Sequence, residues 1–284
     1  MRFRNQPRLT LIGAGPGDPD LITVKGLKKL AEANVVLYDA LVNTLLLRYA
    51  PHNALKLLVG KRAGRHIRTQ AEINRMIVEM ARTYGHVVRL KGGDPFIFGR
   101  GFEELSFAAE HSIPCEVVPG ISSSTGISTM NNIPLTSRGL SESFWVITGT
   151  TADGQLSGDI KIAIRSTATL IILMGMKKLS QIADLYKKNG KGNIPVMVIQ
   201  NGSMDDERSV AGDMTTIESQ VEQAGIVSPA IIIIGEVVYK AEKIRKLNHE
   251  LKYLLLSGME KIPGEFSNLN TKSDEPQQLI SHIS

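Results

Sequence analysis

The sequence predicts an α/β protein with two domains, and three features of the chain support this prediction. Short runs rich in Val, Leu and Ile alternate with helical patterns about every 25–30 residues in the first half, which is typical of parallel α/β units. Glycine-rich turns follow several of these runs. The alternation breaks at residues 134–139, where we place the domain boundary. We therefore expect an N-terminal α/β domain of residues 1–136, a C-terminal α/β domain of residues 137–246, and a short helix with a disordered tail over residues 247–284.

Composition and length narrow the class of protein. The 284 residues are 42% hydrophobic and 21% charged, as is usual for a globular protein. The single cysteine, Cys115, excludes an intramolecular disulfide and a cysteine-rich metal site, and it fits a reducing compartment. The apolar runs at residues 170–174 and 230–234 are too short to cross a membrane, and the run at residues 9–12 is too short for a signal peptide. We expect a cytoplasmic protein.

In the first half, five strands and three helices are predicted in alternation. Residues 70–84 are the clearest helix, because Ile73, Met76, Ile77, Met80 and Ala81 recur at helical spacing and Gly85 ends the pattern. Two more helices are expected over residues 23–33 and 102–111. The expected strands are residues 9–12, 35–38, 56–59, 87–90 and 115–118.

The strand at residues 87–90 ends at Gly92-Gly93, followed by Asp94 and Pro95. Two glycines allow tight turns and the close approach of a ligand to the main chain, and ligands of open α/β sheets lie at the carboxyl ends of strands. The turn at residues 13–18 resembles a dinucleotide-binding fingerprint, but Asp18 stands where the third glycine should be. A dehydrogenase reading, with Asp39 as the ribose-binding acid, is therefore disfavoured.

Polar side chains follow other strands as well. The loop at residues 61–68 is rich in basic residues and could be either a solvated surface loop or an anion-binding loop. Ser122, Ser123 and Ser124 follow the strand at residues 115–118, where hydroxyl groups cap a helix or bind a ligand.

The second half has its own strands and helices. Strands are expected over residues 144–148, 170–173, 196–199 and 231–234, and helices over residues 179–189 and 216–224. Residues 209–212 suggest an additional antiparallel strand. Residues 267–284 are polar and are predicted to be disordered.

Several motifs together resemble the tetrapyrrole methylases, and among them the uroporphyrinogen-III C-methyltransferases. They follow the order of that family over residues 9–240, and the most diagnostic is Leu-Lys-Gly-Gly-Asp-Pro-Phe-Ile-Phe-Gly-Arg-Gly at residues 90–101. The others lie at residues 13–19, 38–42, 60–64, 70–74, 118–121, 133–136, 174–175 and 228–230.

The resemblance implies an enzyme that binds S-adenosylmethionine in a cleft between two α/β domains and releases S-adenosylhomocysteine. It would methylate uroporphyrinogen III at C2 and C7 to give precorrin-2, on the way to sirohaem or cobalamin, and it would be a homodimer. By position, the residues that contact the cofactor would be Pro16, Gly92, Gly93, Asp94, Ile97, Ser122, Ser123, Met174, Gly202, Pro229 and Ala230.

Asp39 falls at the position of the proton acceptor and Lys61 at that of the proton donor. The substrate carries eight carboxylates, so arginines are expected to bind it; the candidates are Arg62, Arg65, Arg68, Arg100 and Arg138. The chain departs from the family pattern at Ser122-Ser123, at Phe102 in place of a glycine, and at Ser137 and Thr150 in place of histidines. The missing histidines also remove a reason to expect a metal.

Three alternatives remain open. Another methylase of the same fold would act on a later corrinoid, on ribosomal RNA or on a diphthamide precursor, but few aromatic residues are available to stack on RNA bases. A dehydrogenase and a non-catalytic nucleotide-binding module are the other two. We expect neither a nucleic acid nor a membrane as a partner.

Overall fold

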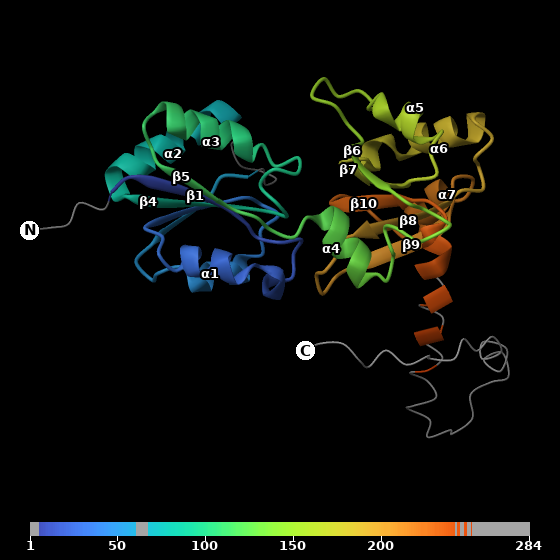
Figure 1. The fold of residues 1–284 in the computed structure, drawn as a ribbon, viewed down its shortest axis with the longest axis horizontal. Helices are drawn as coiled ribbons and strands as arrows, with labels where there is room; N and C mark the ends of the chain where they lie inside the picture. The colour runs from blue at the N-terminus through green and yellow to red at the C-terminus, as the bar shows by residue number, and fades with distance from the viewer. Residues whose placement is uncertain (1–5, 61–67, 242, 245–246, 249–250, 252–284) are drawn as a thin grey trace, which may run out of the picture. The chain divides into compact units, whose positions relative to one another are not determined.

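The computed structural model describes residues 6–60, 68–241, 243–244, 247–248 and 251. Its strands form two five-stranded sheets that belong to two α/β domains (Figure 1). The predicted fold class is therefore confirmed. The domain boundary after residue 136 stays a prediction, and the expectation of a disordered segment at residues 267–284 lies outside the described residues.

The first sheet has the strand order β3-β2-β4-β1-β5, and all its neighbouring strands are parallel. The five predicted strands are present within one residue at either end: β1 (Arg8–Gly13), β2 (Val35–Tyr38), β3 (Leu55–Leu58), β4 (His86–Lys91) and β5 (Cys115–Val118). Both faces of this sheet are buried, as parallel sheets require.

Helices cover both faces of the first sheet. Helix α1 (Val24–Leu30) packs below the sheet in Figure 1, and α2 (Gln70–Tyr84) and α3 (Gly101–Glu110) pack above it. Successive strand residues alternate between the faces, so Ile12 packs with the α1 residues whereas Leu11 packs with the α2 residues. Helix α2 matches the predicted helix. It begins with a capping box between Thr69 and Glu72 and ends at Gly85.

The second sheet has the order β6-β7-β10-β8-β9 and is mixed. The strands are β6 (Phe144–Thr148), β7 (Thr169–Leu173), β8 (Pro195–Gln200), β9 (Arg208–Asp213) and β10 (Ala230–Ile234). Strand β9 pairs antiparallel with β8, which confirms the predicted additional strand.

Helices α5 (Asp159–Ala163), α6 (Leu179–Lys188) and α7 (Ile217–Gln223) contribute to one core of this domain. The other face is covered by α4 (Ser123–Met130), through Ile127, and by Val237, Val238 and Ala241.

Four short elements have no counterpart in the prediction. They are α5 and three 3-10 segments, η1 (Pro19–Leu21), η2 (Thr44–Tyr49) and η3 (Met176–Lys178). None is long enough to show the apolar repeat from which helices were predicted. Among the described residues, none of the helices combines the length and apolar character that crossing a lipid bilayer needs.

Candidate active site

The connections of the first sheet change direction between the neighbouring strands β1 and β4. The connection from β1 leads to β2 on the far side of β4, and the connection from β4 leads to β5 on the far side of β1. The helices that follow these two neighbouring strands, α1 and α3, pack on opposite faces of the sheet. In open α/β sheets, ligands bind outside the carboxyl ends of strands at such a point. The residues there are 13–17 after β1 and 92–95 after β4, and residues 119–122 follow the adjacent β5. We call these three segments the switch-point loops.

The switch-point loops touch one another through their main chains. Gly15 and Gly93 exchange two hydrogen bonds, of 3.2 and 2.7 Å between nitrogen and oxygen. A Cβ atom on Gly120 would lie 2.3 Å from the Gly93 carbonyl oxygen and 2.6 Å from the Gly13 Cα. The glycines at strand ends, predicted to admit a ligand, therefore also serve to pack three loops together. Gly93 itself has a φ of 66°, which favours glycine.

Asp94 ties two of these loops together. One carboxylate oxygen accepts a hydrogen bond from the Phe96 amide at 2.8 Å, and the other accepts one from the Gly120 amide at 3.0 Å. Ser122 caps α4 by accepting a hydrogen bond from the Ser124 amide. The position of a Cβ on Gly93, 3.7 Å from the Ser123 nitrogen, shows that Gly93 faces the beginning of α4.

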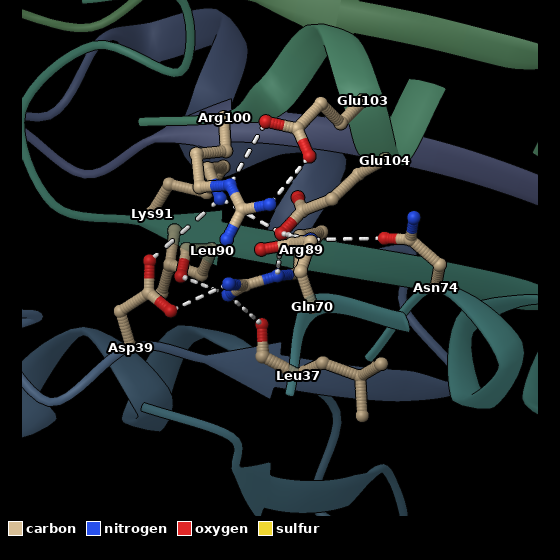
Figure 2. A network of polar contacts seen from close by, with 10 residues as sticks. All are labelled: Leu37, Asp39, Gln70, Asn74, Arg89, Leu90, Lys91, Arg100, Glu103 and Glu104. Atoms are coloured by element: carbon tan, nitrogen blue, oxygen red, sulfur yellow. Dashed lines mark hydrogen bonds and ion pairs between the residues drawn. The ribbon is translucent and has the colours of Figure 1, made fainter. Parts of the chain in front are cut away.

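Asp39 lies directly after β2 and is held by cations from β4. The Arg89 Nη2 atom donates to Asp39 Oδ1 at 2.5 Å, and Lys91 Nζ lies 3.9 Å from Asp39 Oδ2 (Figure 2). The Asp39 side chain is 28% exposed, whereas those of Arg89 and Lys91 are buried. The predicted proton acceptor is thus held by charged contacts and remains partly exposed to solvent.

A second carboxylate, Glu104 of α3, lies on the buried side of the same two cations. Its Oε1 atom accepts hydrogen bonds from Arg89 Nε at 3.1 Å, from Lys91 Nζ at 2.9 Å and from Gln70 Nε2 at 3.2 Å. Burial, and then the neighbouring Arg89, lower the pKa of Lys91, whereas Glu104 and Asp39 raise it. We call Asp39, Arg89, Lys91 and Glu104 the buried charge cluster.

Exposed apolar side chains and Arg100 lie near these loops in the sequence, and Arg138 is a second predicted substrate residue that the structure describes. Leu41 follows Asp39, and Phe96, Ile97, Phe98 and Phe102 follow Asp94; all five are exposed. Phe96 and Phe102 contact each other edge to face. Arg100 forms two hydrogen bonds with Glu103, of 2.8 and 2.6 Å, and Arg138 is exposed.

The predicted cofactor residues of the second half lie at the ends of strands of the second sheet. Met174 follows β7, is exposed and has a φ of 54°, and its carbonyl accepts a hydrogen bond from Thr150. Pro229 and Ala230 lie at the start of β10, and the Pro229 carbonyl accepts a hydrogen bond from the Asn201 amide.

The turn after β8 contacts the first half of the chain at Gly202 and Ser203. A Cβ on Gly202 would lie 2.5 Å from the Ile127 side chain of α4. The neighbouring Ser203 accepts a hydrogen bond from the Asp18 amide at 3.0 Å, two residues after Pro16. Gly202 and the loop that contains Pro16 are therefore both close to α4, since the Pro16 ring would lie 3.3 Å from a Cβ on Gly126.

Lys61, Arg62 and Arg65 lie outside the described residues. Conversely, the prediction did not single out Arg89, Lys91, Glu104 or Gln70. A signal for two of them was present, because charged residues alternate with apolar ones in a strand whose neighbours are buried. Within the described ranges, His, Cys, Asp and Glu side chains form no cluster of three that could ligate a metal ion.

Comparisons with known proteins identify the family of the chain. Residues 8–218 match the family model described as Tetrapyrrole (Corrin/Porphyrin) Methylases. A uroporphyrinogen-III C-methyltransferase of Methanocaldococcus jannaschii is 41% identical over 233 residues, which are 81% of this chain and 96% of that protein. A siroheme synthase of Chromobacterium violaceum is 40% identical over 82% of this chain, but the chain spans only half the length of that relative.

Solved structures show the same similarity. The uroporphyrin-III C-methyltransferase of Thermus thermophilus, crystallised with S-adenosylhomocysteine, matches with a TM-score of 0.70 and 40% identity over 82% of this chain and 99% of that one. A cobalt precorrin-4 methyltransferase matches with a TM-score of 0.73 and 27% identity over 82% of this chain and 96% of that one. Together with the family match over most of the sequence, these similarities show that the chain belongs to the tetrapyrrole methylases.

Proposed function

We propose that this chain is a uroporphyrinogen-III C-methyltransferase, which uses S-adenosylmethionine to methylate C2 and C7 of its substrate and produces precorrin-2. One observation carries the proposal. A partly exposed carboxylate, Asp39, is fixed by buried cations next to the switch-point loops, in a chain about 40% identical to two such enzymes over nearly their whole lengths.

The cofactor fits the switch-point loops. S-adenosylmethionine supplies a methyl group on a sulfonium, which a carbon nucleophile can displace in line. Gly92 and Gly93 would let its polar parts approach the main chain, and Ser122 and Ser123 would offer the amides and hydroxyls at the start of α4. We assign the same cofactor to Asp94 and to Pro16, Ile97, Met174, Gly202, Pro229 and Ala230.

The substrate is a large macrocycle with apolar faces and a rim of carboxylates. Exposed apolar side chains such as Leu41, Phe96 and Phe102 suit the faces. Arg100 and Arg138 would bind carboxylates, as would Arg62 and Arg65.

The chain's chemical contribution is alignment and proton transfer. The methylated macrocycle must lose a proton, and the Asp39 carboxylate would accept it. Lys61 would return a proton or hold the polyanionic substrate. A homodimer in the cytoplasm remains our prediction for the state and place of the enzyme, and light scattering that gives the 31.0 kDa monomer mass would contradict the dimer.

The decisive experiment is anaerobic incubation of the full chain with uroporphyrinogen III and S-adenosylmethionine that carries a deuterated methyl group, followed by mass spectrometry. We expect a product that has gained two labelled methyl groups, and no product when the cofactor is omitted. A chain that binds the cofactor but leaves uroporphyrinogen III unchanged would contradict the proposed substrate. Cobalt precorrin-4 in a parallel reaction tests a later corrinoid as the substrate.

A further inference from the structure

The buried charge cluster places charged side chains inside the protein at the carboxyl end of β4, where side chains of a parallel sheet are usually apolar. The side chains of Arg89 and Lys91 are 2% and 3% exposed and that of Glu104 is fully buried. Figure 2 shows the two cations lying between the two carboxylates, with Asp39 on one side and Glu104 on the other. Arg89 contacts both carboxylates directly, through Nη2 and Nε.

Fold stability alone gives a poor account of this arrangement. Burying ion pairs usually stabilises a protein less than apolar side chains of the same volume would. One oxygen of Glu104, Oε2, is buried and has no hydrogen-bond partner in the part of the chain that the structure describes. An unsatisfied buried carboxylate oxygen weakens the folded state. A role in function explains why charge is nevertheless kept at this strand end.

We propose that Glu104 is a positioning residue, which balances the charge of Arg89 and Lys91 and holds them so that they orient the Asp39 carboxylate toward the substrate. This inference rests on the proposed function, in which Asp39 accepts a proton. Glu104 itself touches neither substrate nor cofactor in this proposal, because its carboxylate is fully buried.

The charges around Asp39 determine the direction in which each substitution changes the electrostatic field at its carboxylate. Asp39 faces Arg89 and Lys91 of β4, and behind them Glu104 of α3, so the cluster holds two cations and two carboxylates. Next to the cluster, Arg100 and Glu103 neutralise each other. Gln70 and Asn74 of α2, which donate and accept hydrogen bonds there, are uncharged.

Removing either buried partner therefore changes the field at Asp39 in a known direction. Glu104→Gln leaves Asp39 with two cations and no second carboxylate, which favours the charged form of the Asp39 carboxylate. Lys91→Met leaves it with one cation and a second carboxylate, which disfavours that charged form. The double variant leaves one cation alone and should fall between the two.

The test is the pH dependence of kcat for uroporphyrinogen III, which reports groups that titrate in the enzyme–substrate complex. We expect the acid limb to move to lower pH in Glu104→Gln and to higher pH in Lys91→Met, and kcat at its optimum to fall about tenfold or more in both. Affinity for S-adenosylmethionine should be unchanged, since neither side chain is assigned to the cofactor. Glu110→Gln makes the same substitution at an exposed position on α3 and should leave the profile unchanged.

The outcomes separate this inference from the proposed function. Wild-type chain that does not methylate uroporphyrinogen III overturns both. Active wild type with an unmoved acid limb in Glu104→Gln, or with a shift in the same direction in both single variants, overturns only the role of Glu104. If Glu104→Gln does not fold, Lys91→Met decides alone, and an unmoved acid limb in that variant overturns the proposal.

Discussion

The Arg89 guanidinium lies 2.5 Å from the Asp39 carboxylate, although the two residues are fifty positions apart in the chain. The contact joins the ends of β2 and β4, which are neighbours in the sheet and are in register over four residue pairs. The ion pairs with Arg89 and Lys91 orient the Asp39 side chain at the end of β2.

Replacing the proposed proton acceptor tests this relationship. Asp39→Asn keeps the size of the side chain but removes its charge and its basicity, so we expect turnover per folded molecule to fall about 10²–10⁴-fold. The melting temperature should also fall, because Arg89 loses a charged partner. Affinity for S-adenosylmethionine should stay the same.

Turnover and melting temperature are measured on the same preparation, and Asp159→Asn, at an exposed position, serves as the control. A lower melting temperature with normal turnover per folded molecule would show that Asp39 has a structural role only.

The contact between the switch-point loops gives a second prediction. Gly120→Ala would place a Cβ 2.3 Å from the Gly93 carbonyl oxygen, and because that atom is main chain the loops must shift. We expect the free energy of unfolding to drop by about 1–3 kcal/mol. Gly158→Ala is the control, since a Cβ there meets nothing within 4 Å, and it should change stability by less than about 0.5 kcal/mol. Chemical denaturation measures both, and equal stability of the two variants would contradict the packing argument.

Most of the fold could be predicted from the sequence because its signals are local. The helix at Gln70–Tyr84 combines an apolar repeat, a Thr69 cap and a Gly85 stop within a short stretch, and the structure has these bounds. The strands of the first sheet are short runs of β-prone residues between turns, and they too lie where predicted. The single turn of helix at Asp159–Ala163 carries no such repeat and was missed.

The candidate site could be predicted only in part, for a physical reason. Asp39 and Gly92-Gly93 stand at strand ends, so sheet geometry alone brings them to one edge. Glu104 lies on a helix, and only the packing of α3 against the sheet turns it toward Arg89 and Lys91. Tertiary contacts of this kind leave no pattern within a segment. The charges in β4 could have been recognised, but their partners could not.

A third prediction concerns pH and stability. His86 is 2% exposed. Burial lowers its pKa below the ordinary value of about 6.5, and the charges of Arg8 and Lys29 lower it further, while contacts with Glu32 raise it. The folded protein thus keeps His86 neutral where the unfolded chain takes up a proton. The contribution of His86 to the free energy of unfolding should therefore be constant above about pH 6.5. It should decrease as the pH falls from there toward the pKa of His86 in the folded protein.

Chemical denaturation at about pH 8 and about pH 5.5 compares the wild type with His86→Gln, which cannot titrate. We expect a smaller loss of stability between the two pH values in the variant. An equal loss in both proteins would mean that other groups cause the acid sensitivity.

The proposed cofactor site yields a fourth prediction, and the structure indicates which glycine to change. Gly93 has a φ of 66°, so a substitution there strains the main chain whether or not a ligand is present. A Cβ on Gly92 instead lies 3.2 Å from the Leu41 Cβ, a tight contact that a shift of a few tenths of an ångström relieves. Gly92→Ala should keep its fold and bind S-adenosylmethionine about tenfold more weakly, or about 1.4 kcal/mol. Unchanged affinity in a calorimetric titration would show that the cofactor does not bind against Gly92.

The last prediction concerns substrate binding by Phe102. Its side chain is 68% exposed and meets Phe96 edge to face, with ring centroids 6.4 Å apart. An aromatic ring this exposed contributes little to the core, so its removal should barely change the melting temperature. If the pair contacts the apolar face of the macrocycle, Phe102→Ala should raise the KM for uroporphyrinogen III several-fold, because a contact of about 0.5–1.5 kcal/mol is lost. Its kcat and its affinity for S-adenosylmethionine should stay close to those of the wild type. Phe144→Ala, which removes another exposed phenylalanine at the start of β6, should leave the KM unchanged. Equal KM values for the two variants would show that the macrocycle binds to another surface. Phe96 and Phe102 would then contact each other without contacting the substrate.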